Sequence, residues 1–555
     1  MPPELPTTPF GSSARSSRAR ARLADWSGPL ALSAGLLATP GCNADADPTP
    51  AVKAEQAVFA TAAPEQSAPA TAAPVRSVLL SGSPTIVASS QPSVRSPAPA
   101  TDDGPRVFAK TRFVWVRERA EWSSQWIGYL WPGESVKLAS KKPIYARGCE
   151  AWYAVEPRGY VCVDGRRATL DRADPELATL ARVPLAAAPP HRYAESLGVQ
   201  RYEKLPDRAE QLAREPDLEQ HLAFVDAARN GGAVDASLDG VDLSPATRDA
   251  VEFAKLPIDL QVPRNALRRD STIAFLDEYR HDGRSFLLTT DLAWVPKDRV
   301  RPYDSVTFQG AHLDQGVRLP LAFFRERERP AYERGSDGHL APSRRKFARL
   351  AWVELTGATE AAGEGRYLET REPGLWALES DCVVPTPAAT TPWGAPVSEA
   401  PPSSPPEERK PWIEASVNGG WLIAYENARP VFVTLAAPGR GGAKRADARD
   451  LMTTSSTPLG TFPITGKFVT ATMDGPDELV HSDVPWVQNF RSAHAIHSAY
   501  WHDAWGERVS GGCLNVSPAD GRYLFGFTLP EVPDGWHGVR WDPHLGPTTT
   551  VIVHR

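Results

Sequence analysis

The sequence predicts a mainly β protein built of several small modules joined by linkers. From about residue 106 onward, short apolar runs alternate with Gly, Pro, Asn and Asp, a pattern typical of short strands and tight turns. One stretch rich in Ala, Pro, Ser and Thr precedes this pattern and a second interrupts it, and such compositions bury too little apolar surface to fold. With 555 residues the chain is long enough for three or four domains.

Composition narrows the class of function. The net charge of −6 is small and dispersed, so nothing in the sequence indicates a nucleic acid as partner. The 17 tryptophans against 3 methionines favour compact β modules with aromatic cores or sugar-facing surfaces.

Residues 1–42 have the pattern of an export segment. Four arginines between positions 15 and 22 precede an apolar segment, 26–38, that is too short to span a bilayer. The segment ends in Gly41-Cys42, which resembles a bacterial lipoprotein processing site and makes Cys42 a candidate for lipidation. A cleaved signal with an incidental cysteine is the alternative. We therefore expect an exported protein of the cell envelope, in the periplasm or cell wall, attached to a membrane by this lipid at most.

Residues 43–105 are predicted to be a disordered tether of Ala, Pro, Ser and Thr. The first module, 106–170, follows with apolar runs at 113–117 and 126–131. A hairpin is predicted around the turn Pro157-Arg158-Gly159, with Cys149 and Cys162 placed so that they can form a disulfide in an oxidising compartment. This module resembles a bacterial SH3-like barrel, in which the aromatic residues form the core or, alternatively, a wall-binding surface.

The middle of the chain is predicted to be mixed. Within 171–317, leucines and alanines at helical spacing predict one or two helices over 206–229, and strands return from residue 273 with a hairpin turn at Asp282-Gly283. Residues 318–385 are a possible second SH3-like module, which would leave Cys382 unpaired. A Pro-rich linker, 386–410, precedes the last domain.

The C-terminal domain, 411–555, is predicted to be mainly antiparallel β with a short helix after Ser517, where Pro518 takes the first helical position. Near its end lies Ser510-Gly511-Gly512-Cys513-Leu514-Asn515, and His497 stands sixteen residues before Cys513 (513 minus 497). Glycines beside a cysteine permit positive φ and a close approach of a ligand, and they leave the sulfur unshielded. A thiolate nucleophile needs a nearby base such as an imidazole. Cys513 and His497 are therefore the candidate nucleophile and general base.

These residues resemble the signature of the YkuD-type L,D-transpeptidases. His497-Ser498 matches the histidine element, the Ser510–Asn515 stretch matches the cysteine element, and Thr457-Pro458-Leu459-Gly460-Thr461-Phe462-Pro463-Ile464 matches the family's T-P-x-G-x-F-x-I block. The resemblance covers about residues 411–555, and it departs from the family pattern at Gly511, where many members have histidine.

The resemblance implies roles for further residues. The backbone carbonyl of Ser498 is expected to orient the His497 ring, and the N–H groups near Gly512 and Cys513 to form the oxyanion hole. Asn515 is expected to brace the cysteine turn or to meet the substrate, and Ser510 is expected to contact the substrate. Trp486 is expected either beside the substrate channel or in the core.

The implied activity is that of a cofactor-independent L,D-transpeptidase acting on peptidoglycan tetrapeptide stems. The stem forms a thioester with Cys513 and is then transferred to an acceptor amine, either of a neighbouring stem, which cross-links the wall, or of a protein, which attaches that protein to the wall. There are two alternatives. The stem could be transferred to water, which is an L,D-carboxypeptidase activity, or the protein could be a non-catalytic wall-binding protein with a degenerate domain. A zinc site of His494, His497, His502 and Cys513 is a further possibility, because imidazole and thiolate are suitable ligands. The sequence makes no prediction about oligomeric state.

Overall fold

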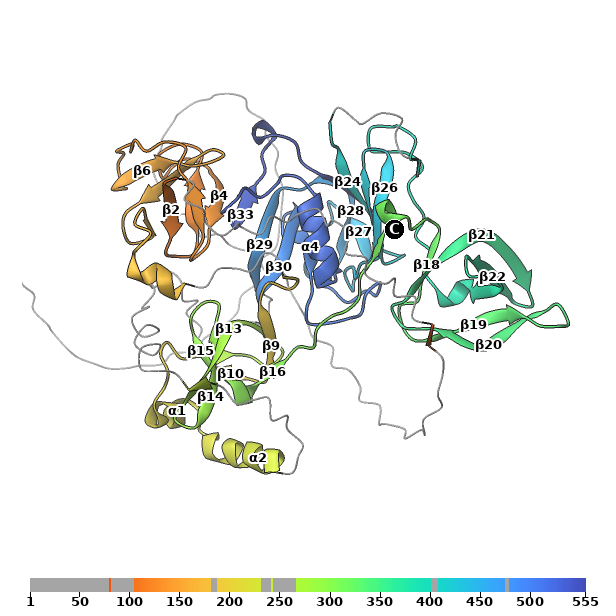
Figure 1. The fold of residues 1–555 in the computed structure, drawn as a ribbon, viewed down its shortest axis with the longest axis horizontal. Helices are drawn as coiled ribbons and strands as arrows, with labels where there is room; N and C mark the ends of the chain where they lie inside the picture. Colours follow the sequence, from red (N-terminus) through yellow and green to blue (C-terminus); the bar gives the residue numbers. More distant parts are fainter. Residues whose placement is uncertain are drawn as a thin grey trace, which may run out of the picture. The chain divides into compact units, whose positions relative to one another are not determined.

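A computed structural model describes residues 79–80, 104–180, 187–230, 241–242, 266–400, 408–474 and 479–555. The predicted export segment, with Cys42, and nearly all of the predicted tether lie outside these residues. Strands dominate the described part, as the sequence predicts (Figure 1). None of its helices combines the length and the apolar character needed to cross a bilayer.

The first module consists of two small antiparallel sheets over a shared core. One has the order β5-β2-β8. The other, β4-β3-β7-β6, is one end of a 15-stranded sheet that continues into the C-terminal domain and the central region. The alternation of buried and exposed residues along β3 places Val114 and Val116 in the core with Ile127 and Val161. The strands are β2 (Arg106–Ala109), β3 (Val114–Arg117), β4 (Trp126–Leu130), β5 (Ser135–Lys137), β6 (Ala151–Ala154), β7 (Tyr160–Val163) and β8 (Ala168–Thr169).

The predicted hairpin and disulfide of this module are both present. β6 and β7 pair in the register Trp152↔Cys162, and Cys149 is bonded to Cys162. The SH3-like character of the module stays a prediction.

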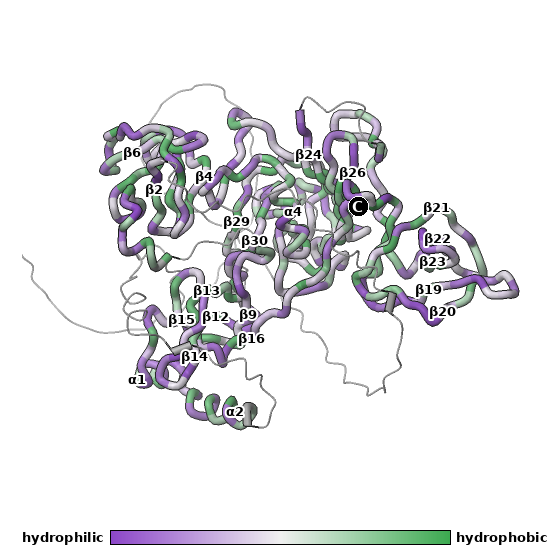
Figure 2. Tube along the Cα trace, in the orientation of Figure 1, coloured by the Kyte–Doolittle hydropathy of each residue, from purple (hydrophilic) through white to green (hydrophobic). Residues whose placement is uncertain are grey.

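The central region is mixed, as predicted. Its helices are α1 (Arg208–Arg214) and α2 (Leu218–Asn230), and Figure 2 shows hydrophobic and hydrophilic residues together along α2. The predicted hairpin is formed by β13 (Thr272–His281) and β14 (Arg284–Thr289). The other elements are η1 (Pro175–Thr179), β9 (Arg192–Ser196), β10 (Val199–Gln200), β11 (Val241–Asp242), β12 (Ala266–Leu267), β15 (Trp294–Pro296), η4 (Lys297–Arg299) and β16 (Val300–Pro302).

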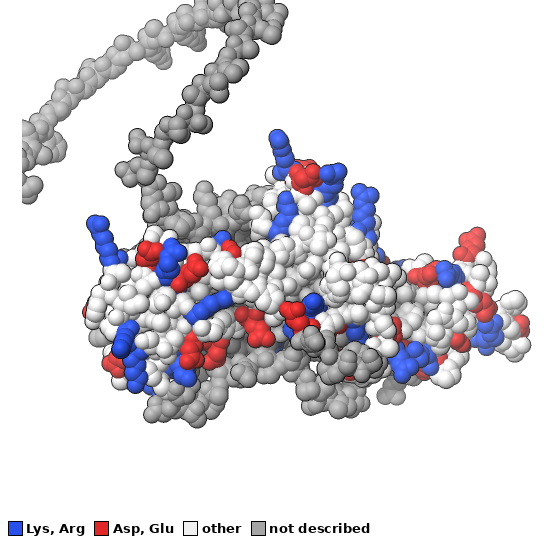
Figure 3. Space-filling view, turned by 90° about the horizontal axis from the view of Figure 1, so that it is seen from above, with Lys and Arg blue, Asp and Glu red and all other residues white. Residues whose placement is uncertain are grey.

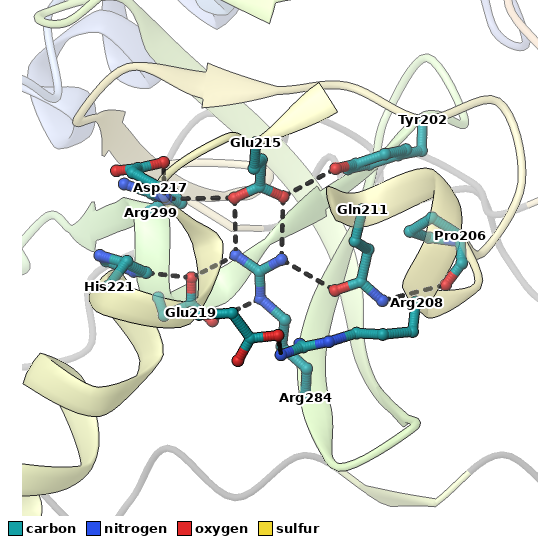
Figure 4. Close-up of polar contacts among 11 residues, drawn as sticks. Tyr202, Pro206, Arg208, Gln211, Glu215, Asp217, Glu219, His221, Arg284 and Arg299 are labelled. Carbon is teal, nitrogen blue, oxygen red and sulfur yellow. Dashed lines mark hydrogen bonds and ion pairs between the residues drawn. The ribbon is translucent and has the colours of Figure 1, made fainter. Parts of the chain in front are cut away.

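A buried ionic cluster holds the helices to the hairpin in this region (Figure 4). The Arg284 guanidinium, at the start of β14, donates to both Glu215 carboxylate oxygens at 2.9 Å and to Asp298 at 2.7 Å. Because a buried charge is tolerated only when it is paired, this arrangement fixes the end of α1 against the sheet.

The residues predicted as a second SH3-like module form another β module. Its sheet has the order β20-β19-β23-β22-β21-β18, and β1 (Leu79–Leu80) pairs with its edge. The strands are β18 (Leu321–Phe323), β19 (Arg329–Arg334), β20 (Leu340–Phe347), β21 (Trp352–Ala362), β22 (Gly365–Thr370) and β23 (Leu375–Leu378), followed by η6 (Glu379–Asp381). Cys382 is a free thiol, as expected.

The C-terminal domain has two sheets and one helix. The first sheet has the order β17-β26-β25-β24-β34-β28-β27, and the second contains β33, β29, β30, β31 and β32. Its strands are β24 (Pro411–Ser416), β25 (Trp421–Glu426), β26 (Arg429–Leu435), β27 (Ala443–Arg445), β28 (Thr457–Pro463), β29 (Gly466–Asp474), β30 (Val480–Arg491), β31 (His494–Ser498), β32 (Leu514–Val516), β33 (Gly538–Arg540) and β34 (Thr550–His554).

Helix α4 (Pro518–Phe527) begins where the sequence predicts. The side chain of Ser517 accepts a hydrogen bond from the Asp520 N–H, and Pro518 is the first helical residue. The helix lies against β30 and β31 (Figure 1), and its Leu524 and Phe527 join the main core of the domain. The short strand β17 (Ala311–His312), which precedes η5 (Leu313–Gln315), also belongs to the first sheet, so that sheet includes residues from before the predicted domain boundary.

Candidate active site

His497 lies on β31, between two strands that fix it. β31 pairs with β30 on one side and with β32 on the other, in the parallel register His497↔Asn515. The ring is buried, and its Nδ1 lies 3.0 Å from the carbonyl oxygen of Ser498. Because a carbonyl only accepts hydrogen bonds, Nδ1 carries the proton and Nε2 keeps a lone pair. The predicted contact with Ser498 is thus present, and its catalytic value stays a prediction.

The turn before β32 presents Cys513 and is held by side-chain hydroxyls. Ser510 Oγ donates to the Cys513 carbonyl at 2.6 Å and accepts from the Gly512 N–H at 3.1 Å. Gly512 has φ +128°, and a Cβ there would lie 3.0 Å from the Ser456 carbonyl oxygen, so this position requires glycine. Thr457, from the block that resembles the family, donates its hydroxyl to the Gly512 carbonyl at 3.0 Å.

The sulfur is covered, which corrects the expectation that the glycine turn leaves it unshielded. Cys513 is 5% exposed and packs with Val484, Val487 and Ala495. Cys513 lies immediately before β32 and packs against the β29–β30 hairpin, a tertiary contact that the local sequence does not reveal. Burial raises the pKa of the Cys513 thiol to about 11 and lowers the pKa of His497 to about 4. At neutral pH both groups are therefore uncharged.

An aromatic residue that the sequence analysis did not single out completes the site. The Trp501 ring lies 4.3 Å from the His481 ring and 6.0 Å from the His497 ring, centroid to centroid, and it packs partly against the cluster that contains Cys513. Burial lowers the pKa of His481 to about 3 and that of His502 to about 4. The pair Tyr500-Trp501, which follows His497-Ser498 after a single alanine, was the available signal for this wall of the site.

The contacts in the structure favour one of the predicted alternatives for some residues and a different role for others. The Gly512 N–H already donates to Ser510 Oγ, so it is not free for an oxyanion. Asn515 and Ser510 are buried, and they brace the site: Asn515 Nδ2 lies 3.1 Å from His502 Nε2, while Ser510 holds the cysteine turn. Trp486 is fully buried against Phe525 of α4, on the face of β30 opposite Val487, which makes it a core residue.

The described residues contain no group of three or more His, Cys, Asp or Glu side chains that could hold a metal ion. The histidines proposed as zinc ligands have other neighbours instead: the Nε2 atom of His494 lies 3.1 Å from the Ser456 carbonyl, and His502 contacts Asn515. Their geometry gives the zinc alternative no support.

Comparison of the sequence with known protein families gives a match over the region that contains this site. Residues 410–553 match the family described as the L,D-transpeptidase catalytic domain, YkuD. No curated protein sequence matches the chain.

Solved structures that match part of the chain include a mutant of the Enterococcus faecium L,D-transpeptidase (22% identity, 26% of this chain and 50% of that chain, TM-score 0.19). A second is an L,D-transpeptidase from Xylanimonas cellulosilytica (23% identity, 27% and 63%, TM-score 0.17). A third is the isolated E. faecium catalytic domain (23% identity, 27% and 100%, TM-score 0.18). The matched region spans half the length of the first of these proteins. By the family match, residues 410–553 form a YkuD-type L,D-transpeptidase catalytic domain, which makes up about a quarter of the chain.

Proposed function

We propose that this protein is a cysteine-dependent L,D-transpeptidase that acts on peptidoglycan tetrapeptide stems in the cell envelope. One observation carries the proposal: Cys513 immediately precedes β32, which pairs in parallel with the strand that holds His497 and its orienting Ser498 carbonyl. The disulfide Cys149–Cys162 supports an exported location, because disulfides persist in oxidising compartments. Lysines, arginines and acidic residues are interspersed on the face drawn in Figure 3, which supports a partner other than nucleic acid.

The reaction starts from an uncharged thiol and an uncharged imidazole. His497 Nε2 accepts the Cys513 proton as the sulfur attacks the carbonyl carbon of the terminal peptide bond of the donor stem. The C–N bond then breaks, the terminal D-alanine leaves with the proton from His497, and the stem remains as a thioester on Cys513. An acceptor amine attacks the thioester, a new amide forms, and the thiol is regenerated.

The oxyanion of each tetrahedral intermediate needs a donor. Since the Gly512 N–H is engaged by Ser510 Oγ, the N–H of Cys513 is the nearest remaining candidate of the two that the sequence indicates. A single donor of this kind contributes about 2.7–4 kcal/mol to transition-state stabilisation.

The test compares the purified wild-type chain with Cys513→Ala, using a carbapenem and a tetrapeptide-rich muropeptide digest. We expect a mass increase equal to one carbapenem on the wild type and none on Cys513→Ala, together with new cross-linked muropeptides from the wild type alone. His497→Gln should form the adduct about 10²–10⁴-fold more slowly.

The same digest separates the alternatives. Release of D-alanine without cross-links identifies a carboxypeptidase. If the wild type forms no adduct and leaves the muropeptides unchanged, the protein is a non-catalytic wall-binding protein. The test includes this outcome because Cys513 is buried.

A further inference from the structure

A cavity of about 410 Å³ lies where the central region meets the catalytic domain. The central region contributes Glu195, Asp270, Arg301 and Asp304 to its lining, and the catalytic domain contributes His481 and Trp501.

Hydrogen bonds and a stacked ring pair join the two walls of this cavity. Ser482 N–H donates to Thr272 Oγ1 at 3.1 Å, and the Tyr193 hydroxyl donates to the Asp483 carbonyl at 2.8 Å. The rings of Tyr193 and Tyr500 stack with centroids 3.6 Å apart. Residues outside the catalytic domain are thereby held beside its active site.

The catalytic-domain wall of the cavity connects directly to the catalytic pair. Trp501 lines the cavity, and the same ring lies 6.0 Å from the His497 ring and against the cluster around Cys513. A molecule held in the cavity therefore contacts Trp501, the ring that lies next to the proposed base His497.

The charge of the cavity favours a cation. Three carboxylates face one guanidinium, and Arg301 is already paired with Glu195 through its Nε at 3.0 Å. Among the described residues, no ion pair engages Asp270 or Asp304. His481 adds no positive charge at neutral pH, because burial lowers its pKa to about 3. Two acidic side chains beside an aromatic ring suit an alkylammonium group.

We propose that this cavity docks the ammonium-bearing side chain of the acceptor peptide and thereby favours transfer of the acyl group to an amine over transfer to water. The inference rests on the proposed thioester chemistry and identifies where its second substrate binds. The ammonium nitrogen first loses one proton to solvent, and its freed lone pair then forms the new C–N bond as the C–S bond breaks. Of the three protons on the ammonium nitrogen, one stays on the amide, one returns to Cys513 Sγ and one leaves to solvent.

The test measures how the acyl-enzyme partitions in the full chain. The donor is a tetrapeptide stem, and the acceptor is a stem tripeptide with a free side-chain amine. The ratio of cross-linked to hydrolysed product is followed against acceptor concentration. For Asp270→Asn/Asp304→Asn we expect the apparent KM of the acceptor to rise about tenfold, and for Asp304→Lys we expect it to rise further. Added salt should raise the KM of the wild type more than that of the double variant.

Asp304→Glu keeps the negative charge, so we expect its KM for the acceptor to be close to that of the wild type. Glu364→Gln removes an exposed charge in the β21–β22 turn, outside the cavity, and serves as the matched control. Asparagine suits position 270 because Asp270 has φ +71° and asparagine tolerates this region. An unchanged acceptor KM in the double variant, or an equal rise in Glu364→Gln, overturns the inference.

A binding measurement keeps this inference separate from the proposed function. Titration calorimetry of the acceptor tripeptide with the Cys513→Ala chain needs no catalysis. Weaker binding after Asp270→Asn/Asp304→Asn supports the cavity even if the wild type forms no thioester. Equal binding with and without the two carboxylates, or no binding to either protein, overturns it.

Discussion

At the scale of single residues, burial keeps Cys513 and His497, the proposed nucleophile and base, uncharged. His497 is 2% exposed, and its only polar contact among those described is the Ser498 carbonyl at Nδ1, which leaves Nε2 free. The burial that raises the pKa of the Cys513 thiol to about 11 also disfavours a resting thiolate–imidazolium pair. Proton transfer must therefore accompany attack on the substrate.

The pH dependence of acylation follows from these two pKa values. Below about pH 4 His497 is protonated and cannot accept the thiol proton, so kcat/KM for the donor should rise as the pH increases through about 4 and stay level through neutral pH. Alkylation of Cys513 by iodoacetamide, which needs the thiolate, should instead accelerate about tenfold per pH unit until about pH 11.

Intact mass measures both rates, and Cys513→Ala corrects the alkylation for the other thiols. An alkylation rate that levels off near pH 8 would contradict the buried, neutral thiol.

At the scale of secondary-structure elements, a buried lysine joins strand to helix. Lys467 of β29 donates through Nζ to the carbonyls of Phe525 at 2.6 Å and Thr528 at 2.7 Å, at the C-terminal end of α4. A cation suits this end because the last carbonyls of a helix have no partner within the helix. The contact fixes α4 against the sheet that carries β31 and His497.

Lys467 also gives the domain a characteristic pH response. Burial lowers its pKa from 10.5 to about 7 in the folded protein, so between pH 7 and 10.5 the unfolded chain binds a proton that the folded chain has released. The free energy of unfolding should therefore rise with pH in this window, by up to about 1.4 kcal/mol per unit. Lys467→Met, of similar length, should lack this rise when urea unfolding is compared at pH 7, 8 and 9. A parallel pH dependence in the two proteins would refute the assignment.

At the scale of the whole described molecule, the catalytic domain does not stand alone. Its strand β30 pairs with β13 of the central region through Thr272↔His481, and β33 pairs with β4 of the first module. The Arg112 guanidinium of the first module lies 3.1 Å from the fully buried carboxylate of Asp483. Asp483 directly precedes Val484, which packs on Cys513, so the accessory modules support the wall of the active site.

Removal of one partner of this buried pair should be costly. Arg112→Met leaves Asp483 buried without its counter-charge, and we expect the free energy of unfolding to fall by about 3–5 kcal/mol. Arg112→Met/Asp483→Asn should recover part of the loss, because the uncompensated charge is gone. Arg119→Met is the matched control: its pair with Glu121 is exposed and screened by solvent, so its loss should lower the free energy of unfolding much less. Urea unfolding of the four proteins measures these differences, and equal losses for Arg112→Met and Arg119→Met would show that the buried pair contributes nothing special.

The sequence by itself determined those features that depend on local pattern. Strand-and-turn alternation predicted a mainly β chain, Ser517-Pro518 predicted the start of α4, and the spacing of Cys149 and Cys162 about a turn predicted their bond. The motifs around His497 and Cys513 identified the family, because those residue types at that spacing have few other uses.

Only the tertiary structure decided what surrounds the reactive groups. The cover over Cys513, the inward direction of Trp486 and the position of Trp501 against His497 all depend on strands that are distant in sequence. The cavity joins Asp270 and Asp304 to Trp501 across about two hundred residues of chain. Pairing between distant strands depends on the burial of whole apolar sheet faces. A local sequence pattern does not specify which sheet face will pack against which other face.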